Sequence, residues 1–309
     1  MSIESLNAFS MDFFSLKGKT AIVTGGNSGL GQAFAMALAK AGANVFIPSF
    51  VKDNGETKEM IEKQGVEVDF MQVDITAEGA PQKIIAACCE RFGTVDILVN
   101  NAGICKLNKV LDFGRADWDP MIDVNLTAAF ELSYEAAKIM IPQKSGKIIN
   151  ICSLFSYLGG QWSPAYSATK HALAGFTKAY CDELGQYNIQ VNGIAPGYYA
   201  TDITLATRSN PETNQRVLDH IPANRWGDTQ DLMGAAVFPR KSGFKLCQWA
   251  FISGRWWLFS ALIHNGGFCF LLLMIIPFLL SGRNYYVFIS RSDCRPAKGN
   301  CWCRSRNYR

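Results

Sequence analysis

Six short runs of β-branched and apolar residues alternate with longer amphipathic stretches along the chain up to Phe238. Each stretch between two runs is long enough for a crossover helix. This alternation is typical of a parallel sheet with helices on both faces. We therefore predict an α/β fold, one doubly wound parallel sheet, without a domain boundary before Phe238. The predicted strands are Thr20–Thr24, Asn44–Ile47, Glu67–Val73, Ile97–Val99, Lys147–Ile151 and Gln190–Ile194.

The first predicted strand runs directly into a glycine-rich turn, TGGNSGLG, and a helical run follows. Its three spaced glycines let the backbone turn tightly and approach a pyrophosphate, which then lies at the positive end of the helix. A plain strand-to-helix turn is the alternative, but strand and helix flank this turn as dinucleotide binding requires. The predicted contact residues in the turn are Thr24, Gly25, Asn27, Ser28, Gly29, Leu30 and Gly31.

The spacing TGxxxGxG resembles that of the short-chain dehydrogenase/reductase family, and later motifs follow in the family's order over about residues 14–238. Asp74 follows the third strand at the family's adenine-contacting position. Asn-Asn-Ala-Gly ends the fourth strand, and Pro-Gly ends the sixth. The resemblance implies a Rossmann fold that binds NAD or NADP, with Thr201 bonding the nicotinamide carboxamide. The further cofactor contacts that it implies are Ile75, Asn101, Ala102, Gly103, Pro196 and Gly197.

Four residues match the catalytic positions of this family. Tyr166 and Lys170 lie four residues apart on a predicted helix, so their side chains share a face. Ser153 follows the fifth strand, and Asn125 lies in the stretch DVNL. A tyrosine with its ordinary pKa of about 10 is a weak base at neutral pH, so we expect the Lys170 ammonium to favour the phenolate of Tyr166. Ser153 would stabilise the reacting oxygen by donating a hydrogen bond.

The resemblance assigns two further tasks within this set. Lys170, together with Tyr166, also contacts the cofactor, because in the family the lysine holds the nicotinamide ribose hydroxyls. Asn125 would hold a water that connects Lys170 to solvent.

The choice between NAD and NADP depends on the end of the second strand, Ile-Pro-Ser-Phe. An acidic residue there selects NAD, and a nearby basic residue accepts the phosphate of NADP. Neither stands at the usual place. Ser49 is a candidate partner of a ribose hydroxyl, and Lys52 suggests NADP unless it is a solvated loop lysine. We expect NAD or NADP, with NAD favoured.

The substrate is set by the variable segments. Asp202–Ala223 should form a lid, and the run IPANRWG that ends it resembles the sugar-acid branch of the family. Arg225 in this run is a candidate partner of a substrate carboxylate, or else a clamp between lid and domain. We expect Cys105–Lys109, Leu154–Trp162 and Tyr198–Tyr199 to line the pocket.

We predict an NAD(P)-dependent oxidoreductase that interconverts a secondary alcohol and a ketone by hydride transfer, on a sugar acid or polyol. The alternative is a catalytically silent dinucleotide-binding regulatory protein, which would have no use for the four catalytic residues. A small-molecule substrate and a homo-oligomer, dimer or tetramer, follow from the resemblance. No nucleic-acid or membrane partner is expected.

Charge and cysteine content agree with a soluble enzyme. Residues 1–238 contain 19 Lys and Arg against 25 Asp and Glu. Their five cysteines form no CxxC pair and have no histidine at ligand spacing, so we expect reduced thiols and no metal site. The chain shows no basic-then-apolar signal pattern before Leu16, and a cytoplasmic setting is expected.

The composition changes after Phe238. Residues 239–309 contain 11 Lys and Arg against one acidic residue, and four of the seven tryptophans. The family's terminal pattern, SxYVxGxxLxVDGG, is missing there. The apolar stretch Phe268–Leu280 has thirteen residues and a proline, fewer than the ~20 needed to span a bilayer, so a membrane anchor is disfavoured.

A shifted reading frame restores the missing pattern. Suppose that each true codon consists of the last two bases of one codon and the first base of the next. Because tryptophan has a single codon, Trp249-Ala250, Trp256-Trp257 and Trp257-Leu258 must then each decode to glycine. Pro239–Leu262 can be decoded as LASPASNYVNGHLLVVDGGYLVR, followed by a stop. We therefore predict a dehydrogenase domain at residues 1–238 and an out-of-frame tail at 239–309, with the last strand of the sheet missing.

Overall fold

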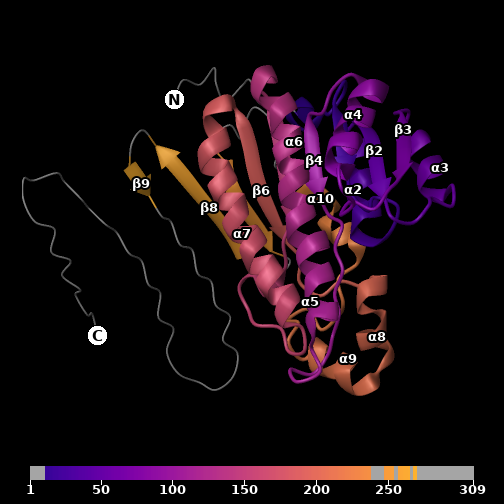
Figure 1. The fold of residues 1–309 in the computed structure, drawn as a ribbon, viewed down its shortest axis with the longest axis vertical. Coiled ribbons are helices and arrows are strands. Elements are labelled where there is room, and N and C mark those ends of the chain that lie inside the picture. Colours follow the sequence, from indigo (N-terminus) through magenta and orange to yellow (C-terminus); the bar gives the residue numbers. More distant parts are fainter. Residues whose placement is uncertain (1–10, 238–246, 254–256, 265–266, 270–309) are drawn as a thin grey trace, which may run out of the picture. The chain divides into compact units, whose positions relative to one another are not determined.

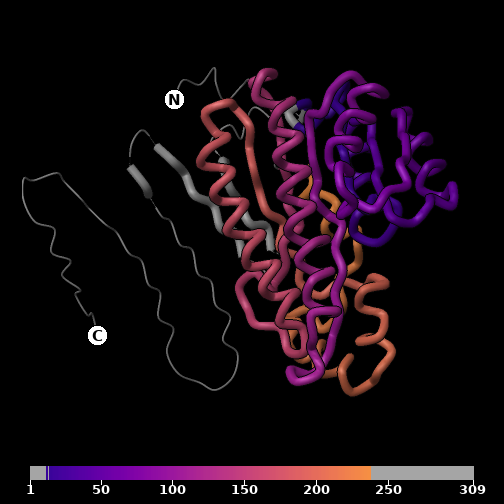
Figure 2. The backbone as a smooth tube through the Cα atoms, viewed as in Figure 1, coloured from indigo at the N-terminus to yellow at the C-terminus, as the bar shows by residue number. Residues whose placement is uncertain are grey.

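The computed structural model describes residues 11–237, 247–253, 257–264 and 267–269, which are coloured in Figure 1. Figure 2 draws the backbone in the same view as a tube. The chain divides into two units, Met1–Leu273 and Met274–Arg309, and the second lies outside the described residues. The predicted boundary at residue 238 therefore stays a prediction.

One sheet contains the strands of the described part, in the order β3-β2-β1-β4-β5-β6-β7-β8-β9 (Figure 1). Neighbours from β3 to β7 pair in parallel, and β8 and β9 are antiparallel. The order reverses at β1, which confirms the doubly wound fold and puts a ligand crevice at the carboxyl ends of β1 and β4. The bounds are β1 (Thr20–Val23), β2 (Asn44–Ser49), β3 (Val68–Gln72), β4 (Ile97–Asn100), β5 (Gly146–Ile151), β6 (Ile189–Ala195), β7 (Cys247–Ser253), β8 (Trp257–His264) and β9 (Gly267–Cys269).

Helices cover both faces of this sheet because successive side chains of a strand point to opposite sides. Ala21 and Val23 of β1 belong to the core that packs on α2 and α10, whereas Ile22 between them belongs to the core that packs on α4, α6 and α7. The helices are α2 (Gly29–Lys40), α3 (Glu56–Glu62), α4 (Ala80–Phe92), α5 (Arg115–Ile122), α6 (Ala128–Gln143), α7 (Pro164–Leu184), α8 (Leu205–Ser209), α9 (Pro211–Leu218) and α10 (Met233–Val237). Shorter helical segments are η1 (Met11–Phe14), η2 (Asp123–Thr127), η3 (Leu154–Ser156), η4 (Gly185–Tyr187), η5 (Asp202–Thr204) and η6 (Thr229–Leu232).

The open edge expected beside β6 is not found. β7 pairs in parallel with β6, with Gly193 opposite Phe251, so the prediction that this position of the sheet is empty is wrong. An unpaired strand edge is a template for any β-prone segment that can reach it. The run CQWAFIS at 247–253 is largely apolar and β-prone, which accounts for its pairing.

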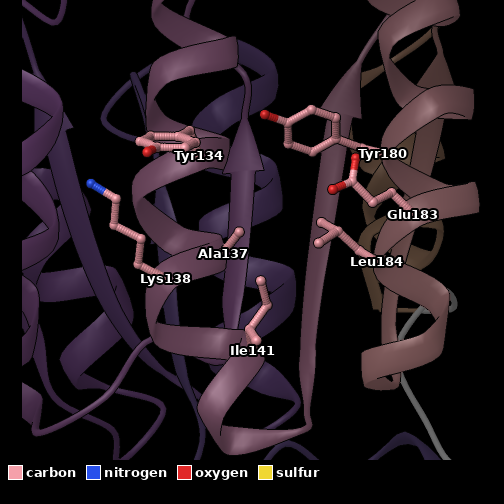
Figure 3. A pocket seen from close by; sticks show the side chains of 7 residues that line it. All are labelled: Tyr134, Ala137, Lys138, Ile141, Tyr180, Glu183 and Leu184. Carbon is pink, nitrogen blue, oxygen red and sulfur yellow. The ribbon is translucent and has the colours of Figure 1, made fainter.

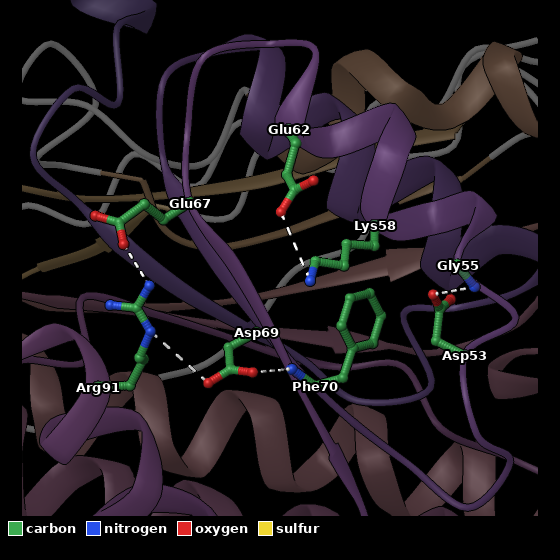
Figure 4. Close-up of polar contacts among 8 residues, drawn as sticks. All are labelled: Asp53, Gly55, Lys58, Glu62, Glu67, Asp69, Phe70 and Arg91. Atoms are coloured by element: carbon green, nitrogen blue, oxygen red, sulfur yellow. Dashed lines mark hydrogen bonds and ion pairs between the residues drawn. The ribbon is translucent and has the colours of Figure 1, made fainter.

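Exposed ion pairs tie α4 to the outer strand β3. The guanidinium of Arg91 on α4 is paired with Glu67 and, at 3.8 Å, with Asp69 (Figure 4). Within the described ranges, no helix is long and apolar enough to cross a bilayer. No group of metal-ligating side chains occurs in that same part of the chain.

Candidate active site

The glycine-rich turn at residues 24–31 joins β1 to α2. Gly25 and Gly29 have left-handed φ angles of +62° and +52°, which favour glycine. A Cβ added at Gly31 would lie 2.2 Å from the backbone oxygen of Gly25, so the turn closes only with glycine there. Ser28, the N-cap residue of α2, makes no side-chain capping hydrogen bond within the described residues. The first N–H groups of α2 are therefore available to an anion such as a pyrophosphate.

Residues after β1, β4 and β6 meet at this turn. The Thr24 hydroxyl oxygen accepts hydrogen bonds from the backbone N–H groups of Asn101 and Ala102, both at 2.9 Å. The Asn101 side-chain amide donates to the Thr24 carbonyl at 2.9 Å. Thr201 approaches from the other side, since its methyl carbon would lie 3.7 Å from a Cβ on Gly29. A dinucleotide cradle thus has walls from three strand ends.

The remaining predicted cofactor contacts follow the ends of β1, β4 and β6 and also of β3. Asp74, two residues beyond β3, is exposed, and its carboxylate accepts hydrogen bonds from the Thr76 hydroxyl and backbone N–H. These bonds lower the pKa of Asp74, the hydroxyl having the larger effect, so the group is a charged acceptor. The other members of the set in these loops are Asn27, Leu30, Ile75, Gly103, Pro196 and Gly197.

Tyr166 and Lys170 lie in the first two turns of α7. The Lys170 amine lies 5.5 Å from the centre of the Tyr166 ring and donates a hydrogen bond to the Ile151 carbonyl at 2.7 Å. Only 4% of Lys170 is exposed. The carbonyl at the end of β5 thus fixes the amine beside the phenol.

Ser153 follows β5 and caps η3, where its hydroxyl oxygen accepts a hydrogen bond from the backbone N–H of Phe155. Its side chain is also hydrogen-bonded to Tyr166. Ser156 holds both parts in place, because its hydroxyl donates to the Lys170 carbonyl at 2.7 Å and its oxygen accepts from the Ser153 N–H. The sequence analysis missed Ser156, although the Ser-x-x-Ser spacing is a signal of reciprocal capping.

Asn125 lies in η2, a π-helical segment that interrupts the helical run from α5 to α6. Such interruptions are frequent at functional sites. The Asn125 side-chain oxygen accepts from the backbone N–H of Ile104 at 2.8 Å, and its amide donates to the Ile104 carbonyl at 2.9 Å and to Thr169 at 3.4 Å. A Cβ on Gly103 would lie 3.2 Å from Asn125 Oδ1 and 3.8 Å from Lys170 Nζ. The structure therefore brings Asn125 and Lys170 to the same crevice.

Burial governs the protonation of the central pair. It raises the pKa of Tyr166 to about 12, against a smaller lowering by the hydrogen bond from Ser153. Burial likewise lowers the pKa of Lys170 to about 8. The expectation that Lys170 lowers the pKa of Tyr166 is not met here, because removing both groups from water disfavours the phenolate and the ammonium alike.

Edge-to-face aromatic contacts lead away from Tyr166. Its ring lies 6.1 Å from that of Phe155, which lies 6.5 Å from Tyr198, which in turn lies 5.9 Å from Trp226. The indole N–H of Trp226 donates to the side-chain oxygen of Asn214 on α9 at 2.7 Å. We call these four rings the aromatic wall; it links the phenol to the expected lid.

Two residues considered in the sequence have other partners in the structure. Arg225 pairs with Asp231 at 2.8 Å, which fits the structural clamp of the two alternatives. The Ser49 hydroxyl donates to the Asn27 side-chain oxygen at 2.8 Å, so it is not free to donate to a ribose. Asp53 accepts from a backbone N–H two residues later (Figure 4). Lys52 is exposed.

A second hollow lies between α6 and α7 and contains none of the four predicted catalytic residues (Figure 3). It is lined by Tyr134, Ala137, Lys138, Ile141, Tyr180, Glu183 and Leu184. The five cysteines of residues 11–237 are free thiols. Burial raises the pKa of Cys152, next to Ser153, to about 11, so this thiol is protonated at neutral pH.

Comparison with known proteins shows the family of this chain. The family model for short chain dehydrogenases matches residues 19–212. The uncharacterized oxidoreductase YgcW of Escherichia coli (strain K12) is 99% identical over 238 residues, 77% of this chain and 91% of that protein. The 2-dehydro-3-deoxy-D-gluconate 5-dehydrogenase of Bacillus subtilis (strain 168) is 44% identical over 229 residues, 74% of this chain and 89% of that enzyme.

A solved structure shows the same likeness. The gluconate 5-dehydrogenase of Burkholderia cenocepacia J2315, in complex with NADP and tartrate, superposes with a TM-score of 0.73. It is 34% identical, and the match covers 79% of this chain and 96% of that one.

Proposed function

This chain belongs to the short chain dehydrogenase family and is an NAD(P)-dependent oxidoreductase acting on CH–OH groups, and from this premise we propose that its substrate is a sugar acid. Two of the relatives named above are named for gluconate and its 2-dehydro-3-deoxy derivative, and the solved one of these holds tartrate, a hydroxy acid. The observation that carries the proposal is the grouping of Ser153, Tyr166 and Lys170 at the glycine-lined crevice.

Four side chains would carry the reaction. The bound dinucleotide accepts or supplies the hydride. During ketone reduction Ser153 donates a hydrogen bond to the carbonyl oxygen, and the Tyr166 hydroxyl transfers its proton to that oxygen. During alcohol oxidation the proton moves back to Tyr166. Lys170 would hold the ribose hydroxyls, and Asn125 would keep the Lys170 amine connected to solvent.

The cradle would hold the dinucleotide along three strand ends. The turn at 24–31 and the N-terminus of α2 would bind the pyrophosphate. Asp74 and Ile75 would flank the adenine, Asn101–Gly103 and Lys170 the nicotinamide ribose, and Thr201 the carboxamide.

The test is a panel of sugar acids, their reduced polyols and simple secondary alcohols, assayed with NAD and NADP by the absorbance of the reduced nicotinamide. We expect the highest kcat/KM for a sugar acid, at least about tenfold above the polyol with the same carbon chain. A neutral alcohol as the best substrate would refute the proposal and leave the family assignment intact.

Replacing Lys52 with alanine tests the cofactor choice. We propose that NAD is preferred and that NADP is also accepted, because β2 ends without a carboxylate that would repel its phosphate. Lys52 is the exposed cation nearest to this end in sequence. The change should raise KM for NADP about two- to fivefold, as expected for an exposed ion pair, and KM for NAD should change by less than about twofold. Equal effects on both cofactors would show that Lys52 does not face the phosphate.

The pH dependence should differ between the two directions. Oxidation needs Tyr166 as the phenolate, and burial raises the pKa of Tyr166 to about 12. We therefore expect kcat/KM for oxidation to increase with pH between about pH 7 and pH 10. Lys170, with a pKa lowered to about 8, becomes neutral within that range. The increase should therefore become shallower above about pH 8. Reduction uses protonated Tyr166 and should show no such increase; rate profiles in both directions measure this.

We also propose a homo-oligomer. Phe130 and Tyr134 on α6 are 46% and 51% exposed beside Phe176 of α7. Exposed aromatic groups of this kind favour association with a second copy. Light scattering of the purified protein gives its mass, and a monomer at assay concentration would contradict the proposal.

A further inference from the structure

A sugar acid carries a carboxylate, and a bound carboxylate needs a cation. Two cations near the candidate site pair with carboxylates: Arg225 with Asp231 at 2.8 Å, and Lys106 with Asp117 at 3.6 Å. Arg208 uses two of its donors to hold the segment after β6, at the Thr201 carbonyl (3.0 Å) and the Thr204 hydroxyl (3.3 Å). Lys170 is committed to the reacting centre. Arg216, in the segment 202–223 expected to form the lid, is a further cation.

Arg216 on α9 is held by neutral groups. Its guanidinium donates to the side-chain oxygen of Gln161 at 3.2 Å and lies 5.1 Å from the centre of the Trp162 ring. Within the described residues, no carboxylate lies within ion-pair distance of it. A guanidinium has five N–H donors in a fork that matches a carboxylate. Its charge and most of its donors are thus left for a ligand.

Trp162, whose ring lies against the Arg216 guanidinium, has an unfavourable backbone conformation. Trp162 has φ of +66°, where bulky residues are outliers that surrounding contacts must stabilise. Two hydrogen bonds do so: the Trp162 carbonyl accepts from the Asn108 N–H at 2.8 Å, and the neighbouring Ser163 hydroxyl donates to the Lys106 carbonyl at 2.8 Å. The indole that carries the guanidinium is therefore placed by the loop at 106–108.

The same helix is anchored to the aromatic wall. Asn214, two residues before Arg216, accepts the hydrogen bond from Trp226. The wall then leads through Tyr198 and Phe155 to the Tyr166 ring. On its other side α9 rests on Trp162, four residues before Tyr166 in the chain. Both attachments of α9 are therefore made to segments that also hold the reacting phenol.

We propose that Arg216 binds the carboxylate of the sugar acid and so determines the preference for acids over neutral polyols. The proposal rests on the proposed function and adds the residue that recognises the substrate. Arg216 is a specificity residue, and it takes no part in proton or hydride transfer.

The experiment compares Arg216→Met and Arg216→Lys with the parent enzyme on a matched pair of substrates. The pair is the best sugar acid of the panel and the polyol with a CH2OH group in place of its carboxylate. Arg216→Met should lower kcat/KM for the acid by about 10- to 100-fold more than for the polyol, as expected for lost hydrogen bonds to a charged group. The loss should lie mainly in KM, and Arg216→Lys should recover part of it. Thermal melting of each variant checks the fold.

Each other outcome overturns the assignment. An equal loss on acid and polyol would make Arg216 a latch that only holds α9 in place. If Lys109→Met loses the preference for the acid while Arg216→Met keeps it, the carboxylate binds at the loop 106–109 and not at Arg216. If the parent enzyme shows no preference for acids at all, the proposed function itself fails, which the parent measurement reveals before any variant is made.

Discussion

Replacing Tyr166 with phenylalanine is expected to lower kcat by about a thousandfold, within the range for loss of a general acid or base. The change removes one hydroxyl and keeps the ring, so the contact with Phe155 and the packing around Lys170 should persist. Dinucleotide affinity should fall only slightly, because the glycine turn and the end of β4 provide most of the cradle. Steady-state rates and cofactor titration measure the two effects separately.

Tyr180→Phe is the matched control for this variant. It makes the same chemical change on the same helix, about 21 Å along the axis from Tyr166 at 1.5 Å per residue, at the hollow between α6 and α7 (Figure 3). We expect its kcat to stay near that of the parent. A Tyr166→Phe enzyme that keeps parent activity would exclude Tyr166 as the proton donor, whereas a parent protein that binds the dinucleotide and turns over no substrate would favour the regulatory alternative.

The sequence predicts the sheet well because its signal is local. Each buried parallel strand is a short apolar run between helical stretches, and the six predicted strands from Thr20 to Ile194 correspond to β1 to β6. The edge beyond β6 was not predictable in this way. Whether a segment such as 247–253 pairs there depends on an edge created by the rest of the fold, and the run itself has no family pattern.

The site is predictable as a set of residues but not as an electrostatic environment. Spacing is enough to group Tyr166 with Lys170, yet the direction of their pKa shifts depends on burial that only the packed structure reveals. The same holds for cations: Arg225 and Arg216 look alike in the sequence, and only their partners, Asp231 in one case and Trp162 in the other, tell them apart.

We propose that residues 239–309 are an out-of-frame reading of the family's terminus, and that exchanging them for LASPASNYVNGHLLVVDGGYLVR will rescue the protein. The three forced glycines carry this proposal, since no synonymous choice affects them. Length adds support. The 238 residues matched to YgcW make up 91% of that protein, which gives it about 261 residues, and 238 residues followed by the 23 decoded residues give the same length.

The exchange should matter because β6 pairs with β5 on one side and depends on β7 for its neighbour on the other. β7 begins where the decoded terminus would place its own strand, but the tail adds an apolar run and ten net positive charges to the chain. An apolar run that finds no partner in the fold promotes aggregation. We expect the exchanged protein to give several-fold more soluble material, since even small losses of stability change abundance that much.

Activity per milligram of total protein should increase by at least about tenfold, because each 1.4 kcal/mol of recovered stability changes the folded-to-unfolded ratio by that factor. Soluble yield, melting temperature and dehydrogenase rate of the two proteins, expressed side by side, provide the measurement. Truncation after Phe238 is the control that separates removal of the tail from restoration of the strand, since it removes the apolar run without supplying a partner for β6. If the given chain equals the exchanged one in yield and rate, the strand that β7 supplies is sufficient, and the frame of the tail has no consequence for function.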